Sequence, residues 1–225
     1  MAGLKWRVKK SFQLAYFLFI QKPSYCLSFN GNGNKFSCDG RLFNSSVLIT
    51  GRNNSLIVKA GCQLYNTNIT ISGEGNVVIL ENSVVFSEGG RIRVEDNRNM
   101  LHIGDHTNII NCFFSISDDD SKVEVGRNCL FSANVIVRNS DSHSILNEEG
   151  KRFNYSKDVV VGDHVWVSYG ATLLKGSCVA SDSIVGTNAL LANFQGEPNS
   201  LIVGSPAKCV KTGITWDVNR IPKQY

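Results

Sequence analysis

The sequence lacks several features that would assign the chain to a specialised class. Only four of its 225 residues are proline, whereas 20 are glycine, which favours many tight turns over extended linkers. None of its seven cysteines belongs to a CxxC pair or another paired spacing. A disulfide framework and a structural zinc site are therefore unsupported, and we expect a protein of the reducing cytoplasm.

Acidic residues are absent from the start of the chain, so its basic excess is local. Six basic residues precede Asp39, the first acid, while the formal net charge of the whole chain is +4. The charges of the remaining residues nearly cancel. We therefore expect no face that binds nucleic acid over the body of the protein.

Hydrophobic runs long enough to cross a membrane are missing near the N-terminus. Residues 12–20 are mostly apolar, but so short a run cannot span a bilayer, and no small-x-small cleavage site follows it. We expect residues 1–45 to form a basic and apolar cap. Its first part would be a capping helix or a peripheral contact with the inner face of the membrane, with a cleaved leader as the alternative.

The most informative pattern is an aliphatic residue at every sixth position over residues 159–191, which is the period of neither a helix nor a strand. Earlier parts of the chain repeat the same step in triplets, so the sequence contains an internal repeat. The triplets are Val58, Leu64 and Thr70; Leu80, Phe86 and Ile92; Ile103, Ile109 and Ser115; Val125, Phe131 and Val137; Val161, Val167 and Leu173; and Val179, Val185 and Leu191.

A step of six is explained by a short strand and a turn that together present one core residue. Three such units close a triangular coil, and coils stacked about 4.8 Å apart pair their strands with the coils above and below. Small side chains should fill the crowded inward corners. The fifth position of the repeat supplies them at Cys62, Thr107, Cys129, Ala171, Ser177, Ser183 and Ala189. A β-sandwich would instead show alternation with period two. The sequence therefore predicts an all-β protein built as a triangular parallel prism.

Two kinds of insertion interrupt the repeat. Extra residues at 76–79, 98–102 and 121–124 are expected to bulge from a corner or to add a strand. A longer interruption at 143–160 is predicted to leave the prism as a protruding loop, and its first residue is His143.

The final coils carry a family resemblance. The run VGDHVWVSYGATLLKGSCVASDSIVGTNALL, followed by NSLIVGSPAKCVK, resembles the hexapeptide-repeat acyltransferases of the left-handed β-helix fold. The segments NSDSHSI at 139–145, KRFN at 151–154 and GDHVWV at 162–167 resemble the subgroup that O-acetylates bacterial surface polysaccharides, including sialic-acid capsules. The resemblance implies a left-handed parallel β-helix over residues 46–211, followed by a tail at 212–225.

The resemblance also implies a reaction and an assembly. Members transfer an acetyl group from acetyl-CoA, without a metal, to a glycan or polysaccharide acceptor. They work as homotrimers whose active sites lie between subunits.

Two residues would carry the proton chemistry. His143 matches the family's catalytic histidine. A hydroxyl group is almost un-ionised at pH 7, so an imidazole, with an ordinary pKa of about 6.5, has to remove its proton as it attacks the thioester. Asp141 or a backbone carbonyl could orient the ring, although an aspartate beside a turn is commonly a turn former.

Two further residues are candidates for the acceptor site. Trp166 stands at an outward position of its coil, and the resemblance puts it in the groove for acceptor and acetyl-CoA; packing in a trimer interface is the alternative. Asn134 resembles a family asparagine that contacts the acceptor or the thioester, and it could equally cap a corner.

The remaining candidates would bind acetyl-CoA. A backbone N–H near Ser168 or Tyr169 would meet the charge that develops on the thioester oxygen, although the family's glycine at position 168 is a serine here. Gly186 and Thr187 match positions that line the pantetheine arm. The GSPAKCVK turn supplies Ser205, Pro206, Lys208 and Lys211. The two lysines would pair with the nucleotide 3′-phosphate or remain solvated.

Other functions are compatible with the prism. An N-acyltransferase of an amino sugar or nucleotide-sugar would use the same fold and donor. A metal-dependent β-helix hydratase would need three histidines that converge on zinc, and the close pair His102 and His106 lies on a different coil from His143. His106 and His164 share one repeat position and are expected on the solvated surface. A fourth possibility is a binding or assembly scaffold without catalysis.

Overall fold

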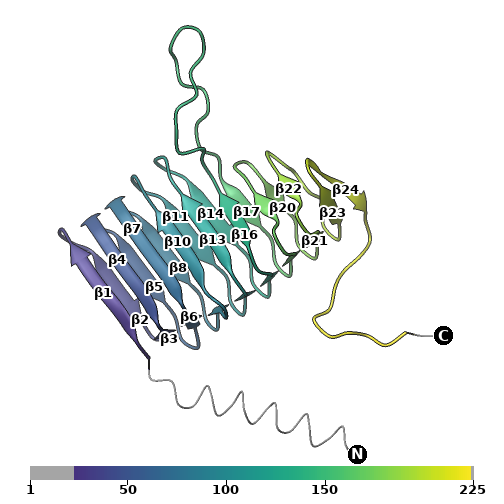
Figure 1. Cartoon of the computed structure of the whole chain (residues 1–225), viewed down its shortest axis with the longest axis horizontal. Helices are drawn as coiled ribbons and strands as arrows, with labels where there is room; N and C mark the ends of the chain where they lie inside the picture. The colour runs from purple at the N-terminus through teal and green to yellow at the C-terminus, as the bar shows by residue number, and fades with distance from the viewer. Residues whose placement is uncertain (1–22, 224–225) are drawn as a thin grey trace, which may run out of the picture.

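The computed structural model describes residues 23–223, which contain 24 β-strands and no helix. The strands lie in three sheets that form the faces of a left-handed parallel prism, and the chain visits the sheets in the fixed order A, B, C as it advances from one end to the other (Figure 1). The predicted all-β, left-handed parallel β-helix is therefore confirmed. No helix within these residues is long and apolar enough to cross a membrane.

Each sheet takes every third strand of the chain as far as β22, after which β23 and β24 both belong to sheet C. Sheet A contains β1 (Tyr25–Asn30), β4 (Ser45–Arg52), β7 (Thr67–Glu74), β10 (Gly90–Val94), β13 (Cys112–Ile116), β16 (Val135–Arg138), β19 (Thr172–Leu173) and β22 (Leu190–Leu191). Sheet B contains β2 (Lys35–Cys38), β5 (Ser55–Val58), β8 (Val77–Leu80), β11 (Met100–Ile103), β14 (Lys122–Val125), β17 (Val159–Val161) and β20 (Cys178–Val179). Sheet C contains β3 (Arg41–Phe43), β6 (Gln63–Tyr65), β9 (Val85–Phe86), β12 (Asn108–Ile109), β15 (Leu130–Phe131), β18 (Trp166–Val167), β21 (Ile184–Val185), β23 (Leu201–Gly204) and β24 (Ala207–Lys211).

The turns between sheets form three edges of the prism, here called the A/B, B/C and C/A corners. The core lies between the sheets and contains nearly all of the aliphatic residues that the six-residue step marks. The small residues predicted for the crowded positions are buried as well, from Cys62 and Thr107 to Ser183 and Ala189. The spacing therefore identified the inward side chains.

Two of the marked positions are wrong. Thr70 and Ser115 do not line the core, and Ser115 instead contacts Arg93 on the outer side of sheet A. The core residues of those strands are Ile69 and Phe114, each one position earlier. The register explains the difference, because Ile92 on β10 is paired with both Ile69 and Phe114. The chain turns the C/A corner one residue sooner in these two coils, so the local step is five rather than six.

The prism also starts earlier than residue 46. Strands β1, β2 and β3 form a coil whose residues pair in register with β4, β5 and β6. Within it Leu42 and Phe43 are buried in the core. Residues 25–43 therefore belong to the β-helix and not to a separate cap. The basic and apolar segment predicted at the start of that cap lies in residues 1–22, outside the described residues.

The extra residues of the early coils do not bulge; they form regular strands of sheet B, namely β8, β11 and β14. Buried asparagines close the A/B corner that these longer coils widen. The side-chain Oδ1 of Asn54 accepts the backbone N–H of Asn76 at 2.9 Å, and Asn76 and Asn99 repeat this bond with the next coil. Because each side chain replaces a missing backbone partner, the ladder satisfies polar groups that would otherwise be buried unpaired.

After β17 the coils become narrower, and strands β18 to β22 have two residues each. The 143–160 interruption emerges from the A/B corner between β16 and β17 as a projecting loop, as predicted (Figure 1). At the other end, β24 turns back antiparallel to β23. The tail then returns to the prism, where Ile214 and Asn199 exchange two hydrogen bonds at 3.0 and 3.1 Å.

Candidate active site

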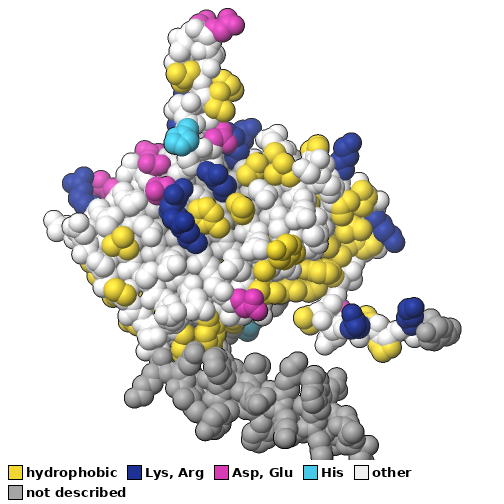
Figure 2. Space-filling view, viewed as in Figure 1, with side chains coloured by type: hydrophobic (Ala, Val, Ile, Leu, Met, Phe, Trp, Pro, Cys, Tyr) yellow, Lys and Arg dark blue, Asp and Glu magenta, His cyan; other side chains and the backbone are white. Residues whose placement is uncertain are grey.

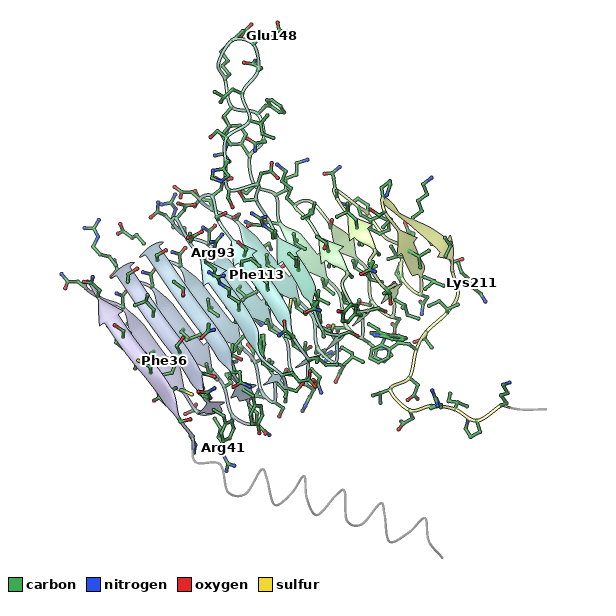
Figure 3. The ribbon with its side chains drawn as sticks, viewed as in Figure 1. Phe36, Arg41, Arg93, Phe113, Glu148 and Lys211 are labelled. Atoms are coloured by element: carbon green, nitrogen blue, oxygen red, sulfur yellow. The ribbon has the colours of Figure 1, made fainter. Side chains whose placement is uncertain are left out.

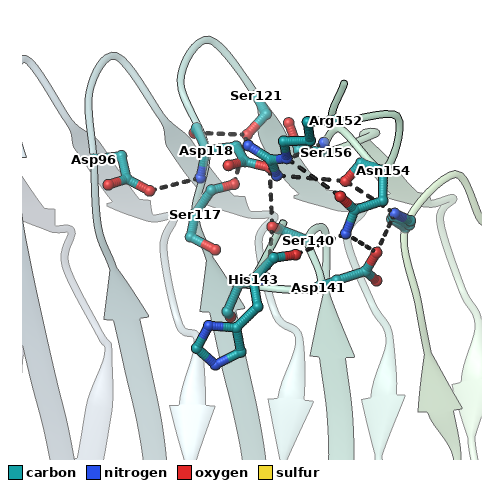
Figure 4. Close-up of polar contacts among 12 residues, drawn as sticks. Asp96, Ser117, Asp118, Ser121, Ser140, Asp141, His143, Arg152, Asn154 and Ser156 are labelled. Carbon is teal, nitrogen blue, oxygen red and sulfur yellow. Dashed lines mark hydrogen bonds and ion pairs between the residues drawn. The ribbon is translucent and has the colours of Figure 1, made fainter. Parts of the chain in front are cut away.

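The base of the loop is fixed to the A/B corner by one half-buried carboxylate. Asp118 accepts hydrogen bonds from Arg152 Nη2 at 2.6 Å, from Ser140 Oγ at 3.0 Å and from the backbone N–H of Ser156 at 3.1 Å. The hydrogen bond from Arg152 is the main reason that the pKa of Asp118 lies below its ordinary value. Both strands of the loop are thus tied to the preceding coil (Figure 4).

Asn154 completes the base from the returning strand of the loop. Its side chain is nearly inaccessible; it accepts the N–H of Ile145 at 2.7 Å and donates to the carbonyl of His143 and to Asp141, each at 2.8 Å. Sequence reasoning missed Asp118, Arg152 and Asn154 as parts of the site. The KRFN segment contained the signal, because it holds two of the three.

His143 is exposed at the foot of the loop, where its backbone is held but its ring is open to solvent. Figure 4 shows the imidazole projecting away from the polar network. No hydrogen bond of the ring is formed with any described residue. Both ring nitrogens are therefore accessible to a substrate from outside the chain.

Asp141 does not orient this ring. Its carboxylate accepts hydrogen bonds from Lys175 Nζ and from Asn154. Burial alone would raise the pKa of Asp141, but these hydrogen bonds outweigh burial and lower it. The predicted dyad of Asp141 and His143 is therefore absent from this structure, because the aspartate is already committed to holding the loop against the coil of Lys175.

Trp166 lies on the opposite side of the prism from His143. It belongs to β18 in the middle of sheet C, between Leu130 and Ile184 of the neighbouring coils. The indole is half-buried, and its Nε1 donates to Ser132 Oγ at 3.4 Å. The A/B corner that carries His143 faces away from sheet C in a three-sided coil, so these two predicted site residues do not meet within one chain.

The next group of predicted residues lines the C/A corner. Asn134 has a positive φ of 58° and donates from Nδ2 to the hydroxyl of Tyr169 at 2.7 Å. The two side chains are therefore brought together on consecutive coils.

The backbone hydrogen bonds at the C/A corner distinguish the two proposed N–H donors, Ser168 and Tyr169. The N–H of Ser168 already donates to the carbonyl of Val185 at 2.8 Å, whereas the N–H of Tyr169 has no partner in the described part of the chain. Tyr169 is thus the open donor, and Ser168 is not.

Gly186 and Thr187 repeat this corner one coil later. The N–H of Gly186 bonds the carbonyl of Ile202, and Thr187 is exposed. A Cβ at position 186 would lie only 2.7 Å from Val203 Cγ1, so this close packing requires a glycine.

The hairpin of β23 and β24 extends sheet C beyond these corners. Ser205 and Pro206 form its turn through a cis peptide bond, and Lys208 and Lys211 lie exposed on β24. None of the ion pairs within residues 23–223 involves either lysine. Both ammonium groups are available to an anion.

Comparisons with known proteins show which family the chain belongs to. The chain is 32% identical over 173 residues to the polysialic acid O-acetyltransferase of Neisseria meningitidis, a match that covers 76% of this chain and 79% of that protein. The chain belongs to the family of these hexapeptide-repeat O-acetyltransferases. No family model matches it.

Solved structures agree with the sequence relationship. The polysialic acid O-acetyltransferase OatWY superposes with a TM-score of 0.80 at 27% identity, over 88% of this chain and 94% of that one. The polysialic-acid-specific acetyltransferase NeuO superposes with a TM-score of 0.78 at 26% identity, over 89% and 85%. The expectation from the GDHVWV coil and the GSPAK turn, an acyltransferase of this family, is confirmed.

The tail of this acetyltransferase adds an aromatic residue that sequence reasoning missed. Trp216 lies over sheet C with its ring centroid 6.0 Å from that of Trp166, and it stacks on His164 at 4.5 Å with an interplanar angle of 12°. Its Nε1 donates to the carbonyl of His164 at 2.8 Å. His164 in turn bonds Asp182 through Nδ1 at 2.8 Å. His164, expected on a solvated corner, therefore forms part of the support for the tail.

The other histidines are dispersed. His102 lies on β11 in sheet B, where Nε2 contacts Glu81 at 3.3 Å, and His106 occupies the B/C corner with a φ of 58°. Within residues 23–223 no three His, Cys, Asp or Glu side chains are grouped so that they could hold a metal ion.

Proposed function

We propose that the protein transfers an acetyl group from acetyl-CoA to a hydroxyl group of an acidic bacterial surface polysaccharide, with a polymer of sialic acid as the acceptor class. The names of the relatives support the acceptor, because both solved neighbours and the Neisseria meningitidis protein act on polysialic acid. The exposed His143 supports the reaction, because its ring is free while its backbone is held.

In this proposal His143 is the general base. The acceptor hydroxyl oxygen attacks the thioester carbonyl carbon, and the imidazole accepts the hydroxyl proton as the new C–O bond forms. The C–S bond then breaks, and the imidazolium returns the proton to the sulfur of CoA. Such a base contributes about 10² to 10⁴ in rate.

The single observation that carries the arrangement is the separation of His143 from Trp166. The histidine projects from the A/B corner, whereas the tryptophan lies on sheet C, the face across the prism. A site that uses both therefore needs two chains. We propose a homotrimer in which His143 of one subunit faces Trp166 and the C/A corner of the next, so that threefold packing assembles three sites.

Acetyl-CoA would lie along the C/A corner. The open N–H of Tyr169 would donate to the thioester oxygen, where negative charge develops in the transition state. Thr187 and Gly186, one coil further on, would contact the pantetheine arm. The exposed Lys208 and Lys211 on β24 would pair with the nucleotide phosphates. As part of the same proposal, the enzyme works in the cytoplasm beside the inner membrane, where its basic N-terminal segment would meet anionic lipid.

A subunit-mixing experiment tests the shared site. Two inactive variants, His143→Ala and Trp166→Ala, are co-expressed with different tags, and mixed trimers are purified through both tags. If each site combines two chains, every mixed trimer has one intact site of three, so the purified mixed trimers should show about a third of the wild-type activity. The assay supplies acetyl-CoA and a sialic acid polymer and measures released thiol. Loss of the product acetyl group in mild hydroxylamine separates an ester from an amide.

The outcomes are distinct. Mixed trimers that stay inactive overturn the shared site. A His143→Ala enzyme with full activity overturns the assignment of the base, and an amide product replaces the O-acetyltransferase with an N-acyltransferase.

A further inference from the structure

Sheet A carries a group of arginines next to the foot of the loop. Arg91 and Arg93 lie on β10, and Arg138 lies on β16, with β13 between them. Residues Arg93, Ser115 and Arg138 are aligned across the three strands. Strands in a sheet lie about 4.8 Å apart, so the two aligned arginines emerge roughly 10 Å from each other on the same face. Figure 2 shows basic side chains gathered on this face below the loop.

An outward aromatic ring holds two of the guanidinium groups. Phe113 on β13 lies under both, with its ring centroid 5.2 Å from Cζ of Arg91 and 5.8 Å from Cζ of Arg93. Figure 3 shows Arg93 and Phe113 side by side on the face of sheet A. Stacking on an aromatic face keeps a guanidinium group planar against the surface and leaves its edge free for a ligand. These side chains are therefore ordered before anything binds.

The positive charge of this face is only partly balanced. Arg93 Nε lies 3.2 Å from Glu95 Oε2, but the two are not aligned as a hydrogen bond. Asp141 is paired with Lys175. Over residues 23–223, neither Arg91 nor Arg138 forms an ion pair, and the buried Nε atoms of Arg93 and Arg138 have no hydrogen-bond partner.

The arginines are also connected to the residue that would do the chemistry. Arg138 Nη2 donates to Ser142 Oγ at 2.9 Å, and Ser142 directly precedes His143. An anion bound by Arg138 would therefore lie beside the base of the loop and near the imidazole. The structure needs no such arrangement for its core, because these side chains all point outward from sheet A.

We propose that Arg91, Arg93 and Arg138 form a binding site for carboxylate groups of the acceptor polysaccharide, which positions a neighbouring hydroxyl at His143. The inference rests on the proposed function and goes beyond it by assigning the acid recognition to these residues. Guanidinium groups suit a carboxylate because they donate two parallel hydrogen bonds to it. Repeated carboxylates along a polymer match several arginines spread over neighbouring strands.

The test separates acceptor binding from catalysis. Arg138→Gln, Arg91→Gln and the double variant are compared with Arg41→Gln, an exposed arginine at the far end of sheet C (Figure 3). Binding of a sialic acid oligomer is measured without acetyl-CoA, next to the same oligomer with its carboxyl groups reduced to alcohols. Steady-state kinetics then give KM for the oligomer and, separately, KM for acetyl-CoA.

We expect each single variant to weaken oligomer binding about tenfold, and the double variant more, because a charged hydrogen bond is lost. The KM for the oligomer should rise in parallel, with kcat and the KM for acetyl-CoA within twofold of wild type. The reduced oligomer should bind poorly to every protein, and Arg41→Gln should behave as wild type.

Several results would overturn the inference. Unchanged oligomer affinity would do so, as would equal affinity for the reduced oligomer. A rise in the KM for acetyl-CoA alone would reassign the arginines to the nucleotide phosphates. A change in oligomeric state on size-exclusion chromatography would reassign them to a subunit contact. Oligomer binding that depends on the arginines in a protein that transfers no acetyl group would sustain this site while refuting the proposed reaction.

Discussion

The early and late coils of the prism differ in the length of their strands and in the side chains that close their corners. Between residues 45 and 138, sheet A strands have four to eight residues and the A/B corner is filled by asparagine side chains. After the loop the sheet A strands β19 and β22 have only two residues each, and small side chains such as Ala171 and Ser183 close the corners. The wide coils offer a corner where polar groups are already bonded by side chains, and a long loop can leave there without exposing unpaired backbone.

Because of this difference, the residues of the proposed site are divided between the wide and the narrow half of the prism. The wide half supplies His143, the loop base and the arginine face, whereas the narrow half supplies a regular corner with the open N–H of Tyr169 and the exposed lysines of β24. In the proposed function, the irregular half would bind the mobile polysaccharide acceptor. The regular half would bind acetyl-CoA, a ligand of constant shape. Four experiments test this division.

The largest effect is expected at the base itself. His143→Ala should lower kcat by about 10² to 10⁴ because no other group would accept the hydroxyl proton. The matched control is His102→Ala on sheet B, which removes a ring whose polar contact within residues 23–223 is with Glu81, and it should leave kcat within twofold. Equal losses in the two variants would show that His143 has no special role.

A second experiment compares the two kinds of corner through stability. Asn99→Ala removes a buried amide that donates to the backbone carbonyl of Glu95 and accepts the backbone N–H and the hydroxyl of Ser121 in the next coil. It should lower the free energy of unfolding by about 2 kcal/mol or more. Ser177→Ala in the narrow half removes a buried hydroxyl that has no partner in the described chain and should be neutral or slightly stabilising. Urea denaturation measures both values, and a larger loss at Ser177 would contradict the comparison.

A third experiment concerns the tail that crosses sheet C. Trp216→Ala should reduce kcat/KM for the acceptor about tenfold, because the aromatic contact that positions Trp166 is lost. The change should appear in KM for the acceptor and in the fluorescence of Trp166, while the midpoint of thermal unfolding shifts little. Val218→Ala, an exposed residue of the same tail, serves as the control. Wild-type kinetics in the Trp216→Ala protein would show that the tail does not contribute to the site.

The smallest effect is the pH dependence of the loop base. Hydrogen bonding to Arg152 lowers the pKa of Asp118 in the folded protein. The ionised carboxylate therefore stabilises the loop base fully above the unfolded pKa of about 3.9, and this stabilisation disappears as the pH falls through the lower folded pKa. Hydrogen exchange of the 143–158 peptide, corrected for its intrinsic rate, should therefore be constant from pH 7 to 5 and rise below about pH 4. In Arg152→Gln the protection should already be reduced at neutral pH. A transition near pH 6 would instead implicate a histidine.

Much of the fold could be predicted because a repeated spacing reports side-chain direction. In a short strand each residue alternates between inside and outside, so a residue such as Val167 marks the core whatever its neighbours do. The prediction failed at Thr70 and Ser115, where one corner is a residue shorter, and it missed the asparagine ladder because buried asparagine resembles turn asparagine in a sequence. The loop and its histidine were visible as an interruption of the repeat.

The sequence by itself determined the three-sided coil, the loop and the family of the reaction, since these depend on local spacing and on short motifs. Tertiary structure decided that His143 and Trp166 lie on opposite sides, that Asp141 pairs with Lys175, and that Trp216 packs over sheet C. These relations depend on how many residues each earlier coil contains and on where the chain turns back. No local pattern encodes them, because each contact joins residues whose separation along the chain is set by everything wound between them.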